Sequence, residues 1–337
     1  MCLFNSKLSK IDYTNLHKPL QIANRTFPVN IIQGPLAGYS SAAFRLLTWQ
    51  YSKPAFSYSE MISANALAKN SRKTRERFLT KDPNEGPVCF QLVGNSAKEL
   101  AEAAKIITDF GADMIDLNCG CSVPKIHGNG AGSSLLLDRP KLYKLLCALR
   151  QSTPLPLLVK IRVAIDSDQT NIEIAKVIAD AGVDCLVVHG RNWKEQYSTP
   201  CRLDAIKFFV EQMKIPVIGN GDVCCLESLK KLLETGSAGV MIARAGVGQP
   251  WLIGKLIAEM EQKPFTIPLP EEVGKIYIAH VTHLAKLLNS EKIAVLQARK
   301  LARPYAKCIK HRKEFCNAIN SCDNLLDFQK LCNDYFW

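Results

Sequence analysis

Short apolar runs alternate with amphipathic stretches from about residue 29 to residue 257. Apolar runs of this length, flanked by turn-forming residues, predict buried strands. We place these strands at residues 29–32, 55–58, 87–91, 114–117, 157–161, 185–188, 216–218 and 239–242. The stretches between them have helical spacing, for example at 97–110, 141–150, 171–181 and 226–234. Gly111, Gly182 and Gly236 follow three of these helices, where a C-cap glycine is expected.

Eight predicted strands that alternate with helices over about 250 residues match an α/β fold of the (β/α)8 TIM-barrel type. A doubly wound open sheet is the rival architecture. Its usual G-x-G-x-x-G after the first strand is absent, because the chain has Gly34-Pro35-Leu36-Ala37-Gly38 at that position. The barrel is therefore the favoured fold.

The residues at the predicted strand ends support the barrel. Enzymes with this fold place their chemistry at the carboxyl ends of the strands. Most of the predicted strands end at a polar or charged residue; the residues at these ends are Pro35-Leu36-Ala37, Glu60, Gln91, Asn118, Lys160, His189, Asn220-Gly221-Asp222 and Arg244. We expect them to lie together around one site.

The barrel pattern ends near Gln262. Three prolines between 264 and 270 argue against a continuous helix there, and the remaining chain has helical but no strand signals. We predict a barrel domain with a short N-terminal extension at residues 1–262, followed by a small all-helical domain at residues 263–337.

A run of basic residues lies in the helical part. Seven basic residues and no acidic residue occur between Arg299 and Lys313. Arg299, Arg303, Lys307 and Lys310 recur at helical intervals on one face, although Pro304 would kink or break that helix. A solvated charged face is the bland interpretation. We favour phosphate binding, with Lys300 added to the patch.

The overall charge agrees with such a partner. The chain of 337 residues has a formal net charge of +12, which favours nucleic acid or an anionic membrane surface. No apolar run approaches the roughly 18 residues of a membrane span, and residues 1–30 lack the order of a signal peptide. We expect a cytoplasmic protein that does not bind membranes and needs no obligate protein partner.

The cysteines carry further information. Thirteen cysteines in a chain of this length do not fit a small secreted disulfide scaffold. No CxxC pair exists, so no metal site is expected. Most thiols are predicted to be apolar filler in a reducing compartment.

One pair of thiols is different. Asn118-Cys119-Gly120-Cys121 joins a predicted strand to a glycine-rich loop, where a thiol can be a nucleophile, a metal ligand or a proton donor.

Other strand-end residues suggest a bound anion and a planar ring. The turns at Asn220-Gly221-Asp222 and Ala243-Arg244 suit a phosphate group. Gln91 and Asn118 offer the donors and acceptors that a flavin or a pyrimidine needs. Lys160 could form a Schiff base, pair with an anionic cofactor edge or lie on the surface, and His189 could be a base, a ligand or a core residue.

These motifs together resemble one family. The resemblance rests on Pro35-Leu36-Ala37-Gly38, Glu60-Met61, Gln91-Leu92-Val93-Gly94, Asp116 to Cys121, Val159-Lys160-Ile161-Arg162, Val188-His189-Gly190-Arg191, Pro216 to Asp222 and Val240 to Arg244. In order and spacing they are similar to the tRNA-dihydrouridine synthases, most like the bacterial DusB-type branch. The C-terminal region resembles the family's helical domain through Arg299-Lys300.

The resemblance implies an FMN enzyme that uses NADPH to reduce uridines in tRNA. Pro35, Leu36 and Ala37 would line the flavin, and Gln91 and Lys160 would contact its ring. Its phosphate would be held by Asn220, Gly221, Asp222, Ala243 and Arg244, with His189 nearby. Asn118 would face the uracil, Cys121 would be the general acid, and Arg299, Lys300, Arg303 and Lys307 would contact tRNA.

The chain departs from the family pattern at several positions. Ser122 follows the cysteine where the family has proline, Cys119 is a second thiol, Ala243 replaces glycine, and Asn192-Trp193 replaces Thr-Arg. Three other functions stay open from the residues: a small-molecule ene-reductase of the dihydroorotate type, an aldolase or isomerase using Lys160, and a noncatalytic RNA-binding protein.

Overall fold

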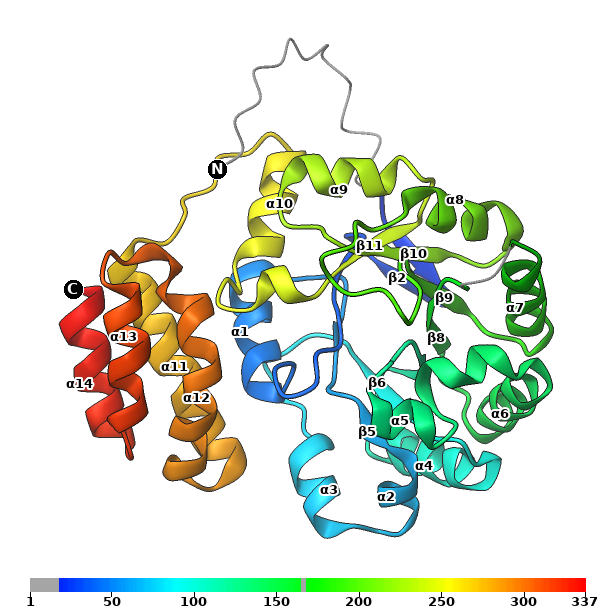
Figure 1. Cartoon of the computed structure of the whole chain (residues 1–337), viewed down its shortest axis with the longest axis horizontal. Helices are drawn as coiled ribbons and strands as arrows, with labels where there is room; N and C mark the ends of the chain where they lie inside the picture. Colours follow the sequence, from blue (N-terminus) through cyan, green and yellow to red (C-terminus); the bar gives the residue numbers. More distant parts are fainter. Residues whose placement is uncertain (1–17, 165–167) are drawn as a thin grey trace.

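The barrel is a closed parallel sheet with helices around it (Figure 1). The computed structural model describes residues 18–164 and 168–337. Its barrel strands are β3 (Ile31–Gln33), β4 (Ser57–Tyr58), β5 (Ile62–Ser63), β6 (Val88–Val93), β7 (Met114–Cys119), β8 (Leu157–Arg162), β9 (Cys185–His189), β10 (Val217–Asn220) and β11 (Gly239–Ile242). Closure occurs at Ser57 of β4, which pairs with both Gln33 and Val88. The predicted TIM barrel is confirmed.

Each apolar run that was predicted as a strand contributes to this sheet, because its side chains are buried on both faces. One face packs inside the barrel, and the other packs under the helices. β5 was not predicted; it pairs with β6 just after β4.

A hairpin of β1 (Leu20–Ile22) and β2 (Arg25–Phe27) was also missed. Leu20, Ile22 and Phe27 pack with the interior side chains of the barrel, such as Ile32 and Met241. The hairpin therefore extends the inner core of the barrel.

The helices of the barrel follow the strands in the order expected for this fold. They are α1 (Ala42–Ser52), α2 (Ala64–Ala68), α3 (Arg72–Phe78), α4 (Ala97–Asp109), α5 (Pro124–Gly128), α6 (Arg139–Ser152), α7 (Asp168–Asp180), α8 (Leu203–Gln212), α9 (Leu226–Leu233) and α10 (Leu252–Met260). Gly111, Gly182 and Gly236 follow α4, α7 and α9 with positive φ values of 89°, 71° and 85°. They end these helices in the way the sequence predicts.

The C-terminal region is helical and packs beside α1 (Figure 1). It contains α11 (Pro270–Leu288), α12 (Glu291–Tyr305), α13 (Arg312–Ala318) and α14 (Leu325–Phe336). Its apolar core includes Ala43, Leu47 and Trp251 of the barrel. The predicted single basic face is wrong in part, because α12 ends at Tyr305 and Lys307 and Lys310 lie beyond it.

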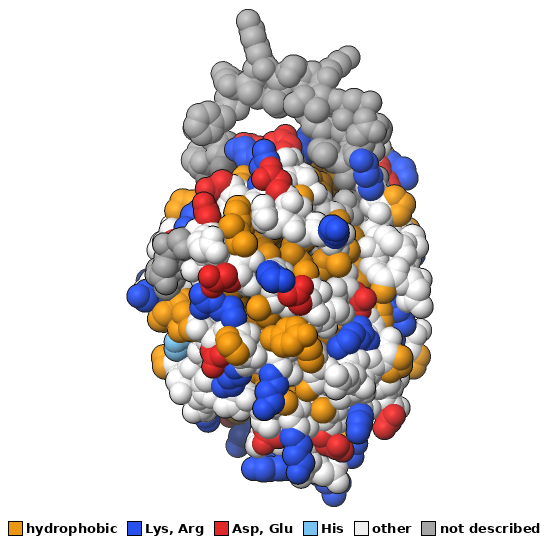
Figure 2. All heavy atoms as spheres, turned by 90° about the vertical axis from the view of Figure 1, so that its right-hand side faces the viewer, with side chains coloured by type: hydrophobic (Ala, Val, Ile, Leu, Met, Phe, Trp, Pro, Cys, Tyr) orange, Lys and Arg blue, Asp and Glu red, His pale blue; other side chains and the backbone are white. Residues whose placement is uncertain are grey.

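The structure also bears on the partners expected from charge. None of the helices in the described ranges is long and apolar enough to cross a membrane. On the side away from the C-terminal helices, Figure 2 shows basic and acidic side chains interspersed. The excess of positive charge is therefore not gathered on that face.

Candidate active site

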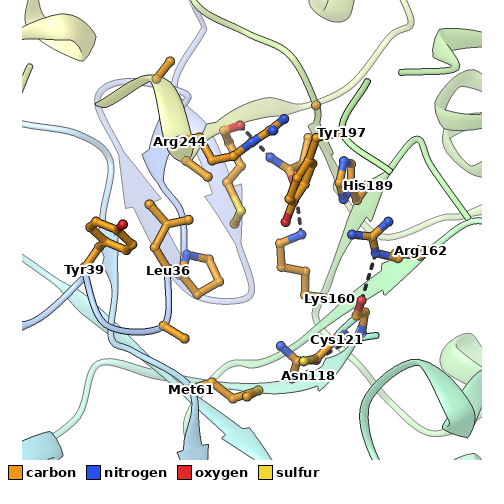
Figure 3. A pocket seen from close by; sticks show the side chains of 18 of the residues that line it. Leu36, Tyr39, Met61, Asn118, Cys121, Lys160, Arg162, His189, Tyr197 and Arg244 are labelled. Atoms are coloured by element: carbon orange, nitrogen blue, oxygen red, sulfur yellow. Dashed lines mark hydrogen bonds between the residues drawn. The ribbon is translucent and has the colours of Figure 1, made fainter. Parts of the chain in front are cut away.

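A cavity of about 830 Å³ lies at the carboxyl ends of the barrel strands (Figure 3). The predicted cofactor residues, together with Asn118 and Cys121, line it: Pro35, Leu36, Ala37, Gln91, Asn118, Cys121, Lys160, His189, Asn220, Gly221, Asp222, Ala243 and Arg244. The structure thus brings together residues spread over more than two hundred positions. The predicted tRNA contacts Arg299, Lys300, Arg303 and Lys307 do not line the cavity, whereas their neighbour Pro304 does.

A chain of hydrogen bonds runs across the strand ends toward the cysteine. The buried Asp116 carboxylate accepts bonds from the Tyr58 hydroxyl at 3.3 Å and from Gln91 Nε2 at 2.8 Å. Gln91 Oε1 accepts from Asn118 Nδ2 at 2.8 Å. Asn118 Oδ1 accepts from the backbone N–H of Cys121 at 2.8 Å. Each amide is therefore fixed in orientation by its neighbours.

These hydrogen bonds leave N–H donors for a ligand. An amide NH2 group has two N–H donors. Gln91 uses one of them in its bond to Asp116, and Asn118 uses one in its bond to Gln91. The free N–H of Asn118 suits a carbonyl oxygen, and that of Gln91 suits a ring acceptor.

Lys160 lies on β8, between Asn118 of β7 and the end of β10. Its ammonium donates to Asn220 Oδ1 at 2.8 Å, and Asn220 Nδ2 donates to the carbonyl of Met241 at 3.0 Å. Burial lowers the pKa of Lys160 to about 8, although the carboxylate of Asp116 opposes the shift. Burial in turn raises the pKa of Asp116 to about 7, against the hydrogen bond from Gln91 and the charge of Lys160.

Cationic side chains gather around His189. Burial lowers the pKa of His189 to about 2, and the charges of Lys160, Arg162, Arg191 and Arg244 add to the shift. The imidazole is therefore neutral near pH 7. A neutral ring with four cations close to it makes this end of the cavity suited to an anion.

Arg244 is held at this end by two contacts. It donates to Asp222 Oδ1 at 3.3 Å, and its guanidinium lies 3.6 Å from the centre of the Tyr197 ring. Arg191, which is buried, donates to the other oxygen of Asp222. Gly221, which precedes Asp222, has a φ of +144°. A Cβ at this position would lie 2.3 Å from Cys201 Sγ. Only glycine fits this turn without strain.

The Cys121 loop is braced from two sides. Arg162 Nε donates to the carbonyl of Gly120 at 2.9 Å. The hydroxyl and the N–H of Ser133 both donate to the carbonyl of Cys121 at 2.9 Å. Cys121 lines the cavity, whereas Cys119 is fully buried among the side chains under the helices. The two thiols are therefore in different environments.

Sequence reasoning assigned no role to Arg162 and Tyr197, which also line the cavity. A signal for Arg162 existed, because residues two apart on a strand share a face and Arg162 follows Lys160 by two. Tyr197 lies in an irregular loop, and its backbone carbonyl accepts a hydrogen bond from Arg191 at 3.1 Å. No pattern in the sequence marks this tyrosine.

The predicted tRNA contacts have diverse surroundings. Arg303 and Lys307 are exposed. Arg299 is partly buried and donates to the carbonyl of Cys322 at 3.3 Å. Lys300 is partly buried, and its ammonium donates to the carbonyl of Gly38. Within the described residues, no group of three or more His, Cys, Asp or Glu side chains could hold a metal ion.

Comparison with known proteins places this site in a family. The family model described as Dihydrouridine synthase (Dus) matches residues 32–336. The chain belongs to the dihydrouridine synthase family, which is a family of oxidoreductases. The tRNA-dihydrouridine synthase B of Pseudomonas aeruginosa is 33% identical over 89% of this chain and 91% of its own length. The tRNA-dihydrouridine synthase B of Vibrio parahaemolyticus is 32% identical over 90% of this chain and 94% of its own length.

Solved structures with this fold are more distant from this dihydrouridine synthase. An old yellow enzyme homologue from Zymomonas mobilis matches with a TM-score of 0.53 and 13% identity, covering 77% of this chain and 96% of its own. Morphinone reductase matches with a TM-score of 0.58 and 11% identity, covering 77% of this chain and 92% of its own. At this identity the likeness shows the barrel fold alone.

Proposed function

We propose that this dihydrouridine synthase reduces uridines in tRNA to 5,6-dihydrouridine, with FMN as its cofactor and NADPH as the electron donor. The curated relatives are named as tRNA-dihydrouridine synthases, and one distant fold neighbour is a morphinone reductase in complex with tetrahydroNAD. The site geometry supports the proposal independently of these names.

The cavity fits a flavin nucleotide. Its volume of about 830 Å³ is within the range of about 300–1,000 Å³ for cofactor sites. Pro35, Leu36 and Ala37 form an apolar wall, as the flat ring requires, and Lys160 and Gln91 would contact that ring. The cations around His189 and the turn at Gly221 would hold the phosphate. Bound FMN would supply the hydride that is added to C6 of the uracil.

Cys121 and Asn118 would complete the reaction on the substrate. Of the neighbouring thiols Cys119 and Cys121, Cys121 is the one that lines the cavity. We assign to it the donation of the proton that C5 must receive. Positioned proton transfer of this kind is typically worth about 10²–10⁴ in rate. The free N–H of Asn118 would bind a uracil carbonyl oxygen. Figure 3 shows Cys121 and Asn118 on the side of the cavity opposite Arg244, so one cavity has room for phosphate and base at separate ends.

The helical region at residues 263–337 would bind the tRNA. Arg303 and Lys307 are exposed and have the charge that phosphates require. The target base must leave its stack, which costs a few kcal/mol and is easiest in loops. The cytoplasmic location and the independence from a protein partner stay predictions.

The hydrogen bond from the Cys121 N–H to Asn118 carries this proposal, because it fixes the proposed acid beside the proposed base-binding amide. The test is an absorbance spectrum of the purified protein, followed by NADPH oxidation with unmodified tRNA. We expect flavin bands and tRNA-dependent oxidation that Cys121→Ala abolishes. Flavin without tRNA dependence would indicate a small-molecule reductase instead. Failure to bind FMN would contradict the proposal.

A further inference from the structure

The loop between β3 and α1 forms one wall of the cavity and is anchored to the barrel. We call residues 34–41 the Gly38 loop; it supplies Pro35, Leu36 and Ala37 to the cavity. The N–H of Gly38 donates to the buried carboxylate of Glu60, which follows β4. Arg77 lies 3.8 Å from the same carboxylate oxygen. The barrel side of the loop is thus held by a charged acceptor.

The same loop is held from the other side by α12. The Lys300 ammonium donates to the carbonyl of Gly38 and lies 4.9 Å from the centre of the Tyr39 ring. Gly38 has φ of +77°, and a Cβ there would lie 3.1 Å from Lys300 Nζ. Burial lowers the pKa of Lys300, although Glu60 opposes the shift. The carbonyl and the ring therefore direct the ammonium of Lys300 toward the Gly38 loop.

Two further contacts tie α12 to the cavity. A Cβ at Gly248, in the loop after β11, would lie 2.6 Å from the carbonyl carbon of Pro304. Pro304 itself lines the cavity. Leu36 packs against the apolar core of the C-terminal helices. The last turns of α12 therefore touch the cavity wall at more than one place.

We propose that Lys300 is a positioning residue that fixes the Gly38 loop to α12, rather than a contact to tRNA phosphate. The position of the C-terminal helices then sets the position of the wall at residues 35–37. By linkage, a ligand on the helices that changes binding in the cavity is itself affected by the cavity ligand by the same factor. The identity of those ligands, tRNA and FMN, rests on the proposed function; the contact itself does not.

Hydrogen exchange in the protein without added cofactor tests the contact directly. We expect Lys300→Met to raise amide exchange in the Gly38 loop roughly tenfold, because a hydrogen bond to a charged donor is lost. Lys300→Arg should restore most of the protection. Lys292→Met is the matched control, because Lys292 is exposed on the same helix. Exchange in β7 reports global stability and should not change.

Two binding measurements separate positioning from phosphate contact. Lys300→Met should weaken FMN binding several-fold, measured by quenching of flavin fluorescence, and leave the salt dependence of tRNA binding unchanged. A phosphate contact would instead reduce that slope by about 1. Unchanged loop exchange together with a reduced slope would overturn the inference. A wild-type protein that binds no flavin would refute the proposed function but not the exchange result.

Discussion

Asn118 Oδ1 accepts hydrogen bonds from the backbone N–H groups of both Gly120 and Cys121, at 3.1 and 2.8 Å. The amide that we assign to the base therefore also shapes the loop of the proposed acid. Its own Nδ2 is held by Gln91, so the position of the thiol depends on a bonded chain that starts at Tyr58 and Asp116. Two of the four links join the neighbouring strands β6 and β7, which pair directly in the closed barrel.

Replacement of Asn118 tests this dependence. Asn118→Ala removes both acceptor bonds, each worth about 1 kcal/mol or more when the N–H groups stay buried. We expect a fall in single-turnover rate of roughly 10- to 100-fold. Asn118→Asp keeps the acceptor for the loop but loses the donor to Gln91, so its rate should fall between those of wild type and Asn118→Ala. Equal rates for wild type and Asn118→Ala would rule out the positioning role.

The turn at Gly221 should control flavin affinity. Gly221→Ala places a Cβ 2.3 Å from Cys201 Sγ at a φ of +144°, so the turn must shift and disturb the contact between Asp222 and Arg244. We expect FMN to bind at least about tenfold more weakly. Cys201→Gly in the same chain removes the clash but not the backbone strain, so it should restore only part of the affinity. Unaltered FMN binding in Gly221→Ala would show that the phosphate does not use this turn.

The buried His189 predicts a loss of stability in acid. Its pKa is about 2 in the folded protein against an ordinary value of 6.5. Below pH 6.5 the unfolded chain binds a proton that the folded chain does not, so the free energy of unfolding falls as pH falls, by about 1.4 kcal/mol per unit for this group. Urea unfolding at pH 7 and pH 5 should show a smaller loss in His189→Asn than in wild type. Identical losses of unfolding free energy in the two proteins would contradict the low pKa of His189.

The exposed basic residues should govern tRNA affinity. Arg303→Ala and Lys307→Ala should each weaken binding and reduce the slope of log affinity against log salt by about 1. Lys214→Ala is the control, because Lys214 is exposed before β10, at the other end of the barrel. Filter binding at several salt concentrations measures the slopes. Equal slopes for the three variants and wild type would place the tRNA elsewhere.

The barrel and its cavity could be predicted from sequence for a physical reason. Strands of a closed parallel barrel end at one rim, so polar residues that end apolar runs, such as Lys160 and His189, must meet there. The contact between Lys300 and Gly38 spans 262 positions and has no local signal. The sequence predicts a kink or a break at Pro304 without choosing between them, because a proline near a helix end permits either outcome. The helix ends one residue later, at Tyr305.

Pro304 has a further consequence for how this protein can be divided. It belongs to α12, yet it lines the cavity at the strand ends of the barrel. Gly248 packs against its backbone. A barrel cut off near residue 262 would lose a piece of this enclosure and would uncover Leu47 and Trp251, which are now in a shared apolar core. The helices are thus a structural component of the proposed active site, and chimaeras that exchange them between relatives must exchange the facing residues of α1 and of the loop after β11 as well.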